Sequence, residues 1–233
     1  MLVPLDEGEQ RELLATACHI LYKLGLSDYL GHPSVRLDEG HVLIKPKHSP
    51  SVRGMDTMAP EDMVMIDLEG HALEADDEPP SERFIHTEIY KARPDVRSVV
   101  HTHQPMATLL GIVGLPILPL LHVESAVVEQ QPVPVFACAE LIVNQELGRG
   151  VAEALGEHKV CHLQGHGIVS VGETVQAATL GAIHLERLAD VNYKAAVLGR
   201  EPRVIPPDEI QALKRHLAAP TGRWAYYAEL AAR

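Results

Sequence analysis

Short apolar runs of strand length alternate along this chain with longer segments of helical periodicity, and this alternation is the strongest constraint on its fold. Apolar runs bounded by turn residues predict strands, whereas apolar residues three and four apart predict helices. A chain that alternates the two packs its helices on a central sheet, so we predict an α/β fold. The predicted strands are 34–37, 41–44, 63–67, 96–101, 133–137, 159–163 and 168–171.

The ends of these elements carry recognisable signals. Asp6 followed by Glu9 resembles a capping box and predicts a helix that ends at Gly25. Tight turns separate the first strands, which predicts antiparallel neighbours. Pro134 cannot donate to a ladder, so the strand around it belongs at an edge of the sheet. Further helices are predicted at 81–93, 140–155 and 174–198.

Length and composition bound the remaining possibilities. A chain of 233 residues with 46% hydrophobic content can bury one substantial core, so we expect a single domain over residues 1–233. Within it, residues 200–233 form a helical tail that closes over a site or packs on a neighbouring subunit. The formal net charge of -12 disfavours nucleic acid as a partner.

No targeting or spanning segment is evident. Residues 1–10 lack the basic and apolar regions of a secretory signal, so we expect a cytoplasmic protein. The apolar stretch 106–121 is broken by glycines and prolines, which predicts no membrane span. Cys18, Cys138 and Cys161 form no paired motif and are expected to be reduced packing residues.

Two histidine motifs point to a metal. His101-Thr102-His103 ends an apolar run, and in an extended chain side chains two residues apart point to the same face, so both imidazoles can reach one ion. His166 stands between Gly165 and Gly167, which let the backbone turn tightly and bring the ring close to an ion or substrate. The alternatives are cross-strand packing for the first motif and an ordinary loop histidine for the second.

Three imidazoles without a thiolate are typical of a catalytic site. We expect one divalent ion per subunit; zinc suits these ligands best, and manganese, cobalt or ferrous iron stay open. Glu82, at the start of the helix before the His101 strand, is the best placed acid or base. Its alternative is an ordinary first-turn glutamate stabilised by the helix dipole.

Four ordered motifs resemble the class II aldolase/adducin family over roughly residues 10–198. The motifs are 31–36 (GHPSVR), 60–70, 79–103 and 165–172. The resemblance implies that His101, His103 and His166 are metal ligands and that Glu82 exchanges a proton with the substrate. It also implies a three-layer α/β/α fold with a central mixed, largely antiparallel sheet, and a homotetramer with sites at subunit interfaces.

Departures from the family pattern bear on the reaction. Sugar-phosphate aldolases of the family hold phosphate with an Asn, a Thr-Gly or Ser-Gly and a Ser-Ser pair; here His32, residues 47–50 and Pro80-Ser81 stand in those places. This exchange removes donors that a dianionic phosphate needs. A catalytic tyrosine of those aldolases is replaced by His122, which we expect to donate a proton.

The 31–36 loop, the run ERFIH and the tail around Tyr226 look most similar to family members that decarboxylate hydroxylated aromatic acids. The resemblance therefore favours a metal-dependent decarboxylase acting on a small molecule. The residues expected to bind the substrate are His32, Ser34, Arg36, Ser81 and Tyr227.

Three alternatives stay open. The first is an aldolase that cleaves a sugar phosphate, in which burial raises the pKa of Glu82 so that it can remove or return a proton. The second is a non-catalytic, adducin-like interaction module, which would be expected to lack the three histidines. The third is a ferrous oxygenase on the same scaffold.

Overall fold

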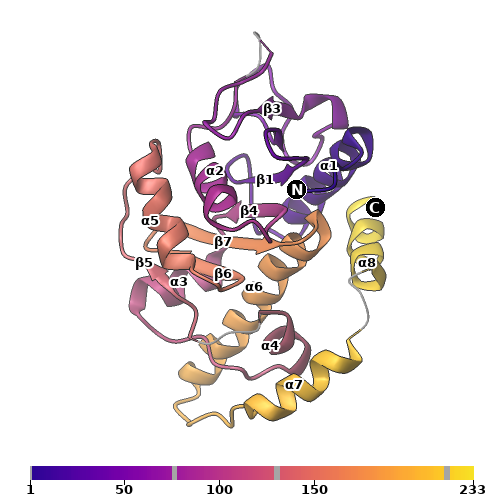
Figure 1. Cartoon of the computed structure of the whole chain (residues 1–233). Coiled ribbons are helices and arrows are strands. Elements are labelled where there is room, and N and C mark those ends of the chain that lie inside the picture. Colours follow the sequence, from indigo (N-terminus) through magenta and orange to yellow (C-terminus); the bar gives the residue numbers. More distant parts are fainter. Residues whose placement is uncertain (1, 75–77, 129–131, 218–220) are drawn as a thin grey trace.

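A seven-stranded sheet runs through the middle of the molecule (Figure 1). The computed structural model describes residues 2–74, 78–128, 132–217 and 221–233. The strand order is β3-β2-β1-β4-β7-β6-β5, and every neighbouring pair is antiparallel except β5 and β6. The strands are β1 (His32–Arg36), β2 (Val42–Ile44), β3 (Val64–Ile66), β4 (Ser98–Thr102), β5 (Val135–Phe136), β6 (Val160–Leu163) and β7 (Gly167–Gly172).

Helices cover both faces of this sheet (Figure 1). α2 and α5 pack together on one face, and α1 and α6 lie on the other. The helices are α1 (Glu7–Lys23), α2 (Arg83–Ala92), α3 (Pro105–Val113), α4 (His122–Val128), α5 (Gln145–Leu155), α6 (Val175–Val197), α7 (Pro207–His216) and α8 (Thr221–Ala231), with a 3-10 turn, η1, at Pro60–Asp62.

The alternation of side chains along the strands divides the core into two layers. Val100 of β4 packs in the layer beneath α1 and α6, and its neighbour Val99 packs in the layer beneath α2 and α5. This is the period of two that an extended chain imposes. Because β4 lies near the centre of the sheet, its side chains are buried on both faces, so polar groups along it must find partners inside the protein.

Side-chain caps fix where the long helices begin. Asp6 accepts a hydrogen bond from the Glu9 N–H at 2.8 Å at the start of α1, as its sequence predicts. Thr174 caps α6 in the same way, and Asn144 caps α5. The predicted helix 140–155 therefore starts later than expected, because residues 140–143 precede the cap and stay outside the helix.

The predicted α/β fold with a mixed, largely antiparallel sheet between helices is confirmed. The strand containing Pro134 was expected at an edge, and β5 is the edge strand next to β6. The sequence patterns predict neither α3 nor α4, and the helical tail predicted over residues 200–233 contains two helices, α7 and α8. Across the described ranges, no helix combines the length and the apolar character needed to cross a membrane.

Candidate metal centre

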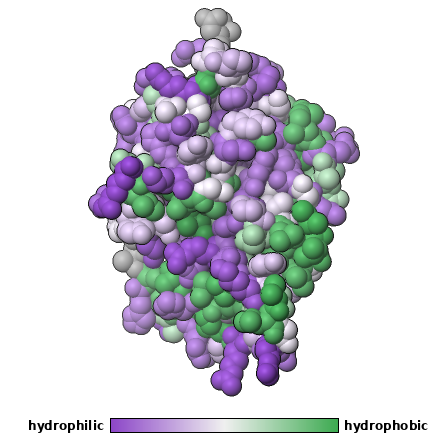
Figure 2. All heavy atoms as spheres, turned by 180° about the vertical axis from the view of Figure 1, so that it is seen from behind, coloured by the Kyte–Doolittle hydropathy of each residue, from purple (hydrophilic) through white to green (hydrophobic). Residues whose placement is uncertain are grey.

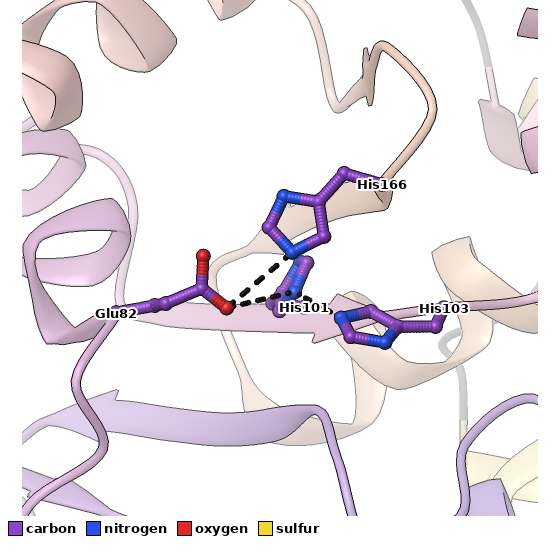
Figure 3. A group of neighbouring side chains, drawn as sticks. All are labelled: Glu82, His101, His103 and His166. Atoms are coloured by element: carbon purple, nitrogen blue, oxygen red, sulfur yellow. Dashed lines mark hydrogen bonds and ion pairs between the residues drawn. The ribbon is translucent and has the colours of Figure 1, made fainter. Parts of the chain in front are cut away.

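Four side chains from three separate segments converge beside the end of β4 (Figure 3). Glu82 is the residue before α2, His101 lies in β4 with His103 just beyond it, and His166 lies in the turn between β6 and β7. One ligand atom from each lies within 4.8 Å of all the others. The structure thus brings together the residues that the sequence singled out for metal chemistry.

The backbone of β4 sets the directions of two of these rings. His101 is extended and central in the sheet, and its Nδ1 lies 2.9 Å from the carbonyl oxygen of Ile168 in β7. Because a carbonyl can only accept, His101 carries its proton on Nδ1, and its Nε2 offers a lone pair. That Nε2 lies 2.9 Å from Nε2 of His103. Two such nitrogens aimed at each other are an arrangement that a shared cation stabilises.

The glycines beside His166 have separate tasks. Gly165 has a φ of +66°, in the left-handed region that glycine adopts without steric cost. Gly167 allows a close approach instead: a Cβ atom there would lie 2.2 Å from the carbonyl oxygen of Thr102. The tight turn and the close packing against β4 together hold the His166 ring over the centre.

Burial sets the charge of the imidazoles. His101 is fully buried and its pKa is lowered well below the usual value, first by burial and then by the neighbouring imidazoles. The pKa of His103 is lowered for the same reasons. Neutral imidazoles are the form that binds a metal.

Glu82 behaves in the opposite way to the expectation for a buried acid. Burial raises its pKa, but a hydrogen bond from His166, favourable electrostatic interactions with the His101 and His166 rings and the Ile142 N–H outweigh burial and lower the pKa to about 2. Its Oε2 lies 3.4 Å from Nε2 of His166, and its Oε1 accepts the Ile142 N–H at 3.1 Å. The expected rise in the pKa of Glu82 is therefore wrong, and the residue is a carboxylate at neutral pH.

The donor set fits a divalent transition metal. Three imidazole nitrogens and one carboxylate oxygen are borderline ligands that suit zinc, manganese, cobalt or ferrous iron. The second layer fits as well, because the Ile168 carbonyl orients His101 and the Ile142 N–H orients Glu82.

His32 lies next to this centre. It pairs directly with His101 across β1 and β4, and the two ring centroids are 5.1 Å apart. Ser81 precedes Glu82 and is partly exposed. The substrate roles predicted for His32 and Ser81 stay predictions; His32 contacts the centre directly, and Ser81 adjoins Glu82 in the chain.

Ser34 and Arg36 share a face of β1 with His32 but do not reach the centre. The Oγ atom of Ser34 is fully buried against His86 and Tyr90, at 2.7 and 2.6 Å. The Arg36 guanidinium donates to the Tyr90 carbonyl at 2.9 Å. A strand advances about 3.3 Å per residue, so four residues place Arg36 about 13 Å beyond His32.

His122 and Tyr227 lie together at a different place. They line a pocket between α4, α6 and α8 that none of the four converging residues lines. Inside it, Arg187 pairs with Glu124 at 3.2 Å and donates to the Tyr227 hydroxyl at 3.2 Å. Within one chain, these two predicted residues are therefore apart from the metal centre.

Sequence reasoning missed the buried polar stripe of α2. His86 and Tyr90 follow Glu82 at intervals of four residues and face the sheet beside Ile85 and Ile89. Polar residues at helical spacing on a face that also carries buried isoleucines are a signal of a buried network. That signal was present in the sequence.

Residues 12–193 match the family described as Class II Aldolase and Adducin N-terminal domain. The chain belongs to this family. As the resemblance of its motifs predicted, it is an enzyme of the class II aldolase superfamily, whose curated relatives include decarboxylases, aldolases and epimerases.

Individual relatives are similar to this chain over most of its length. The 3,4-dihydroxyphthalate decarboxylase of Arthrobacter keyseri is 31% identical over 90% of this chain and 88% of its own length. A 5-methylthioribulose-1-phosphate/5-deoxyribulose-1-phosphate aldolase of Rhodospirillum rubrum is 33% identical over 86% of this chain and 87% of its own length. An aldolase II superfamily protein from Pseudomonas syringae has the same fold, with a TM-score of 0.82 and 21% identity over 98% of this chain and 94% of its own.

Proposed function

We propose that this enzyme is a metal-dependent decarboxylase of a hydroxylated aromatic acid. The observation that carries the proposal is the convergence of three imidazoles and an ionised Glu82 beside His32. Similarity to a 3,4-dihydroxyphthalate decarboxylase over 90% of the chain supports the choice of reaction. His32, in place of an amide that serves phosphate, supports a substrate without a phosphate group.

His101, His103 and His166 would hold the metal, which when bound would supply a Lewis acid for negative charge that develops on a substrate oxygen. The protein residues handle the proton. Glu82 is ionised, so it can accept the proton of a substrate hydroxyl group. The bond between the ring and its carboxylate then breaks, the electron pair enters the ring, and carbon dioxide leaves.

The same residue completes the reaction. Glu82 returns its proton to the ring carbon that lost the carboxylate, so the proton and the electron pair both balance. A carboxyl group with a pKa of about 2 stays ionised between turnovers and readily releases a proton that it has accepted. The hydrogen bond from Ile142 keeps one oxygen of Glu82 in place, while the other lies 3.4 Å from Nε2 of His166 and points into the centre (Figure 3).

A neighbouring subunit is proposed to complete the site. His122 and Tyr227 share a pocket away from their own metal centre, which supports a role toward a neighbour's centre in the predicted homotetramer. Apolar side chains gather in patches on the face seen in Figure 2, and apolar patches of this kind mark subunit interfaces. His122 of the partner subunit is then the alternative to Glu82 as proton donor to the ring carbon, as the sequence predicts. The proposed single domain 1–233 includes the tail that carries Tyr227.

An aldolase is the second candidate. The Rhodospirillum rubrum aldolase is 33% identical over 86% of this chain, and the ionised Glu82 would equally remove a proton beside a carbonyl. The two reactions share the centre and differ in the substrate.

Carbon dioxide release separates these candidates. Purified protein is loaded with zinc, manganese, cobalt or ferrous iron and given 3,4-dihydroxyphthalate, other hydroxyaromatic acids or a ketose 1-phosphate. We expect metal-dependent carbon dioxide release from a hydroxyaromatic acid and none from the sugar phosphate. Cleavage of the sugar phosphate to an aldehyde and a phosphorylated ketone, without carbon dioxide release from any acid, would reject the decarboxylase.

A further inference from the structure

A chain of four polar side chains leads from the metal centre into the layer beneath α2. Nδ1 of His32 lies 2.7 Å from Nε2 of His86, Nδ1 of His86 lies 2.7 Å from Oγ of Ser34, and that Oγ lies 2.6 Å from the hydroxyl of Tyr90. The exposed fractions of these side chains are 6%, 0%, 0% and 1%. Each link is a short hydrogen bond shielded from water, so each must hold one proton in a definite place.

The far end of the chain sets the direction of the bonds. Among the described residues, Ser34 is the hydrogen-bonding side chain that the Tyr90 hydroxyl reaches, and no carbonyl or carboxylate takes its proton. A buried hydroxyl donor without an acceptor is costly, so Tyr90 donates to Ser34. Ser34 then has its own proton left to give, and the acceptor within reach is Nδ1 of His86.

This direction passes through both imidazoles. A neutral imidazole carries one proton, so His86, accepting at Nδ1, has its proton on Nε2 and donates to Nδ1 of His32. Burial lowers the pKa of His86 to about 3, so its ring is neutral and carries a single proton. His32 accepts at Nδ1 and therefore has its proton on Nε2.

We propose that the Tyr90–Ser34–His86 chain fixes His32 as its Nε2–H tautomer and so gives the centre one directed donor for an anionic substrate oxygen. Nε2 of His32 has no hydrogen-bond partner in the described residues, and its ring lies 5.1 Å from the ring of His101. The identity of the substrate group, a carboxylate or a phenolate, rests on the proposed function, whereas the tautomer of His32 does not depend on it.

The directed donor has a consequence for specificity. A neutral N–H favours an acceptor oxygen and disfavours a substrate group that can only donate, because two donors facing each other leave both unsatisfied. Tyr90, Ser34 and His86 are positioning residues that act through His32. This role explains why a helix face otherwise filled by isoleucines carries His86 and Tyr90.

Nitrogen NMR of protein with 15N-labelled histidine tests the tautomer directly. We expect wild-type His32, assigned by the loss of its signals in His32→Gln, to show a protonated Nε2 and a bare Nδ1. In Tyr90→Phe the chain loses the group that fixes its direction, so both nitrogen shifts should move toward averaged values. Tyr22→Phe, a change at an exposed tyrosine of α1, is the control and should leave them unchanged.

Two results would overturn the tautomer assignment. One is a wild-type His32 with its proton on Nδ1, and the other is a Tyr90→Phe spectrum identical to that of the wild type. The wild-type measurement needs no substitution in the chain, so a folding defect in Tyr90→Phe leaves the assignment testable.

Ligand binding tests the donor. Zinc-loaded His32→Leu should bind 3,4-dihydroxyphthalate about tenfold or more weakly than the wild type, as expected for loss of a hydrogen bond to a charged group. His32→Gln, whose amide offers a donor, should recover most of the affinity, and all three proteins should hold the same amount of zinc. Equal binding by the Leu and Gln variants would overturn the donor role. If the proposed reaction fails instead, no variant turns over the acid, while the tautomer result stands.

Discussion

Among single residues, the neighbours of a buried group decide how burial changes its charge. His101 and His103 are kept neutral by burial, which leaves their lone pairs for a metal. Glu82 is 7% exposed, yet the surrounding imidazoles and the Ile142 N–H keep it ionised. A neutral set of nitrogens beside one carboxylate is the charge distribution that a divalent cation requires.

Replacement of Glu82 tests its role in proton transfer. Glu82→Gln keeps the size of the side chain but cannot accept a proton, so kcat should fall about 100-fold or more. The three histidines remain, so metal content by elemental analysis should stay at the wild-type level. Glu146→Gln, at an exposed glutamate in the first turn of α5, is the matched control. A Glu82→Gln enzyme with the kcat of the control would remove Glu82 from the mechanism.

Buried His162 is expected to make the stability of the fold depend on pH. It is 3% exposed, and burial lowers its pKa to about 4 from the ordinary 6.5. Between those values the unfolded chain binds more protons than the folded one, so stability falls as the pH drops below 6.5 and levels off near 4. His162→Leu removes this contribution, which amounts to roughly 2 kcal/mol at pH 5.

Denaturant unfolding at pH 7.5 and pH 5 measures this effect. The His162→Leu variant should lose less stability than the wild type between the two values. The control, His216→Leu, replaces an exposed histidine near the end of α7 and removes no buried imidazole. An unchanged pH dependence in His162→Leu would show that this ring does not resist protonation in the folded state.

At the scale of elements, the turn between β6 and β7 links the sheet to the metal centre. Gly165→Ala places a side chain in open space at a positive φ and should cost about 1 kcal/mol of stability. Gly167→Ala places a Cβ against the Thr102 carbonyl and should cost more, about 2–3 kcal/mol, because β4 must shift. Only the second change moves His103 relative to His166.

Zinc titration and thermal unfolding of the two alanine variants compare these costs. Gly167→Ala should bind zinc at least tenfold more weakly than Gly165→Ala. Equal losses of zinc affinity would mean that the close approach to Thr102 does not position the ligands.

The elements that the sequence predicted are those with a local signal. The HxH motif comes at the end of an apolar run, and this pattern predicted β4. The alternation of side chains along β4 places His101 and Val100 on opposite faces of the sheet. The helices α3 and α4 lacked such a signal. α3 begins at Pro105 and is apolar on most sides, which gives no helical stripe, and α4 is seven residues long.

The parts of the site that could not be predicted depend on contacts between distant segments. Ser34 is buried away from any substrate, and the pKa of Glu82 is low, only because α2 packs on β1 and β4. Burial alone predicted a raised pKa for Glu82, whereas the folded neighbours reverse it. Sequence spacing also could not show that Arg36, at the far end of β1, donates to the Tyr90 carbonyl of α2.

At the scale of the whole molecule, sharing of sites between subunits is testable by mixing variants. His101→Ala lacks a proposed metal ligand, and Tyr227→Phe lacks a hydroxyl of the other pocket. If one subunit's Tyr227 serves a neighbour's centre, the mixed oligomer contains some complete sites and regains activity that neither variant has alone. If the oligomer is shown to exchange subunits and the mixture has only the sum of the two variants' activities, both residues act within the same subunit.

The central claim is that His101, His103 and His166 hold a divalent metal on which the reaction depends. Elemental analysis of purified wild-type protein beside His101→Ala, with the exposed-site variant His71→Ala as control, tests it most directly. We expect about one metal ion per chain in the wild type and the control, and the loss of both the metal and the activity in His101→Ala. A folded, metal-replete wild-type preparation without bound metal, or a His101→Ala variant that keeps both metal and activity, would contradict it.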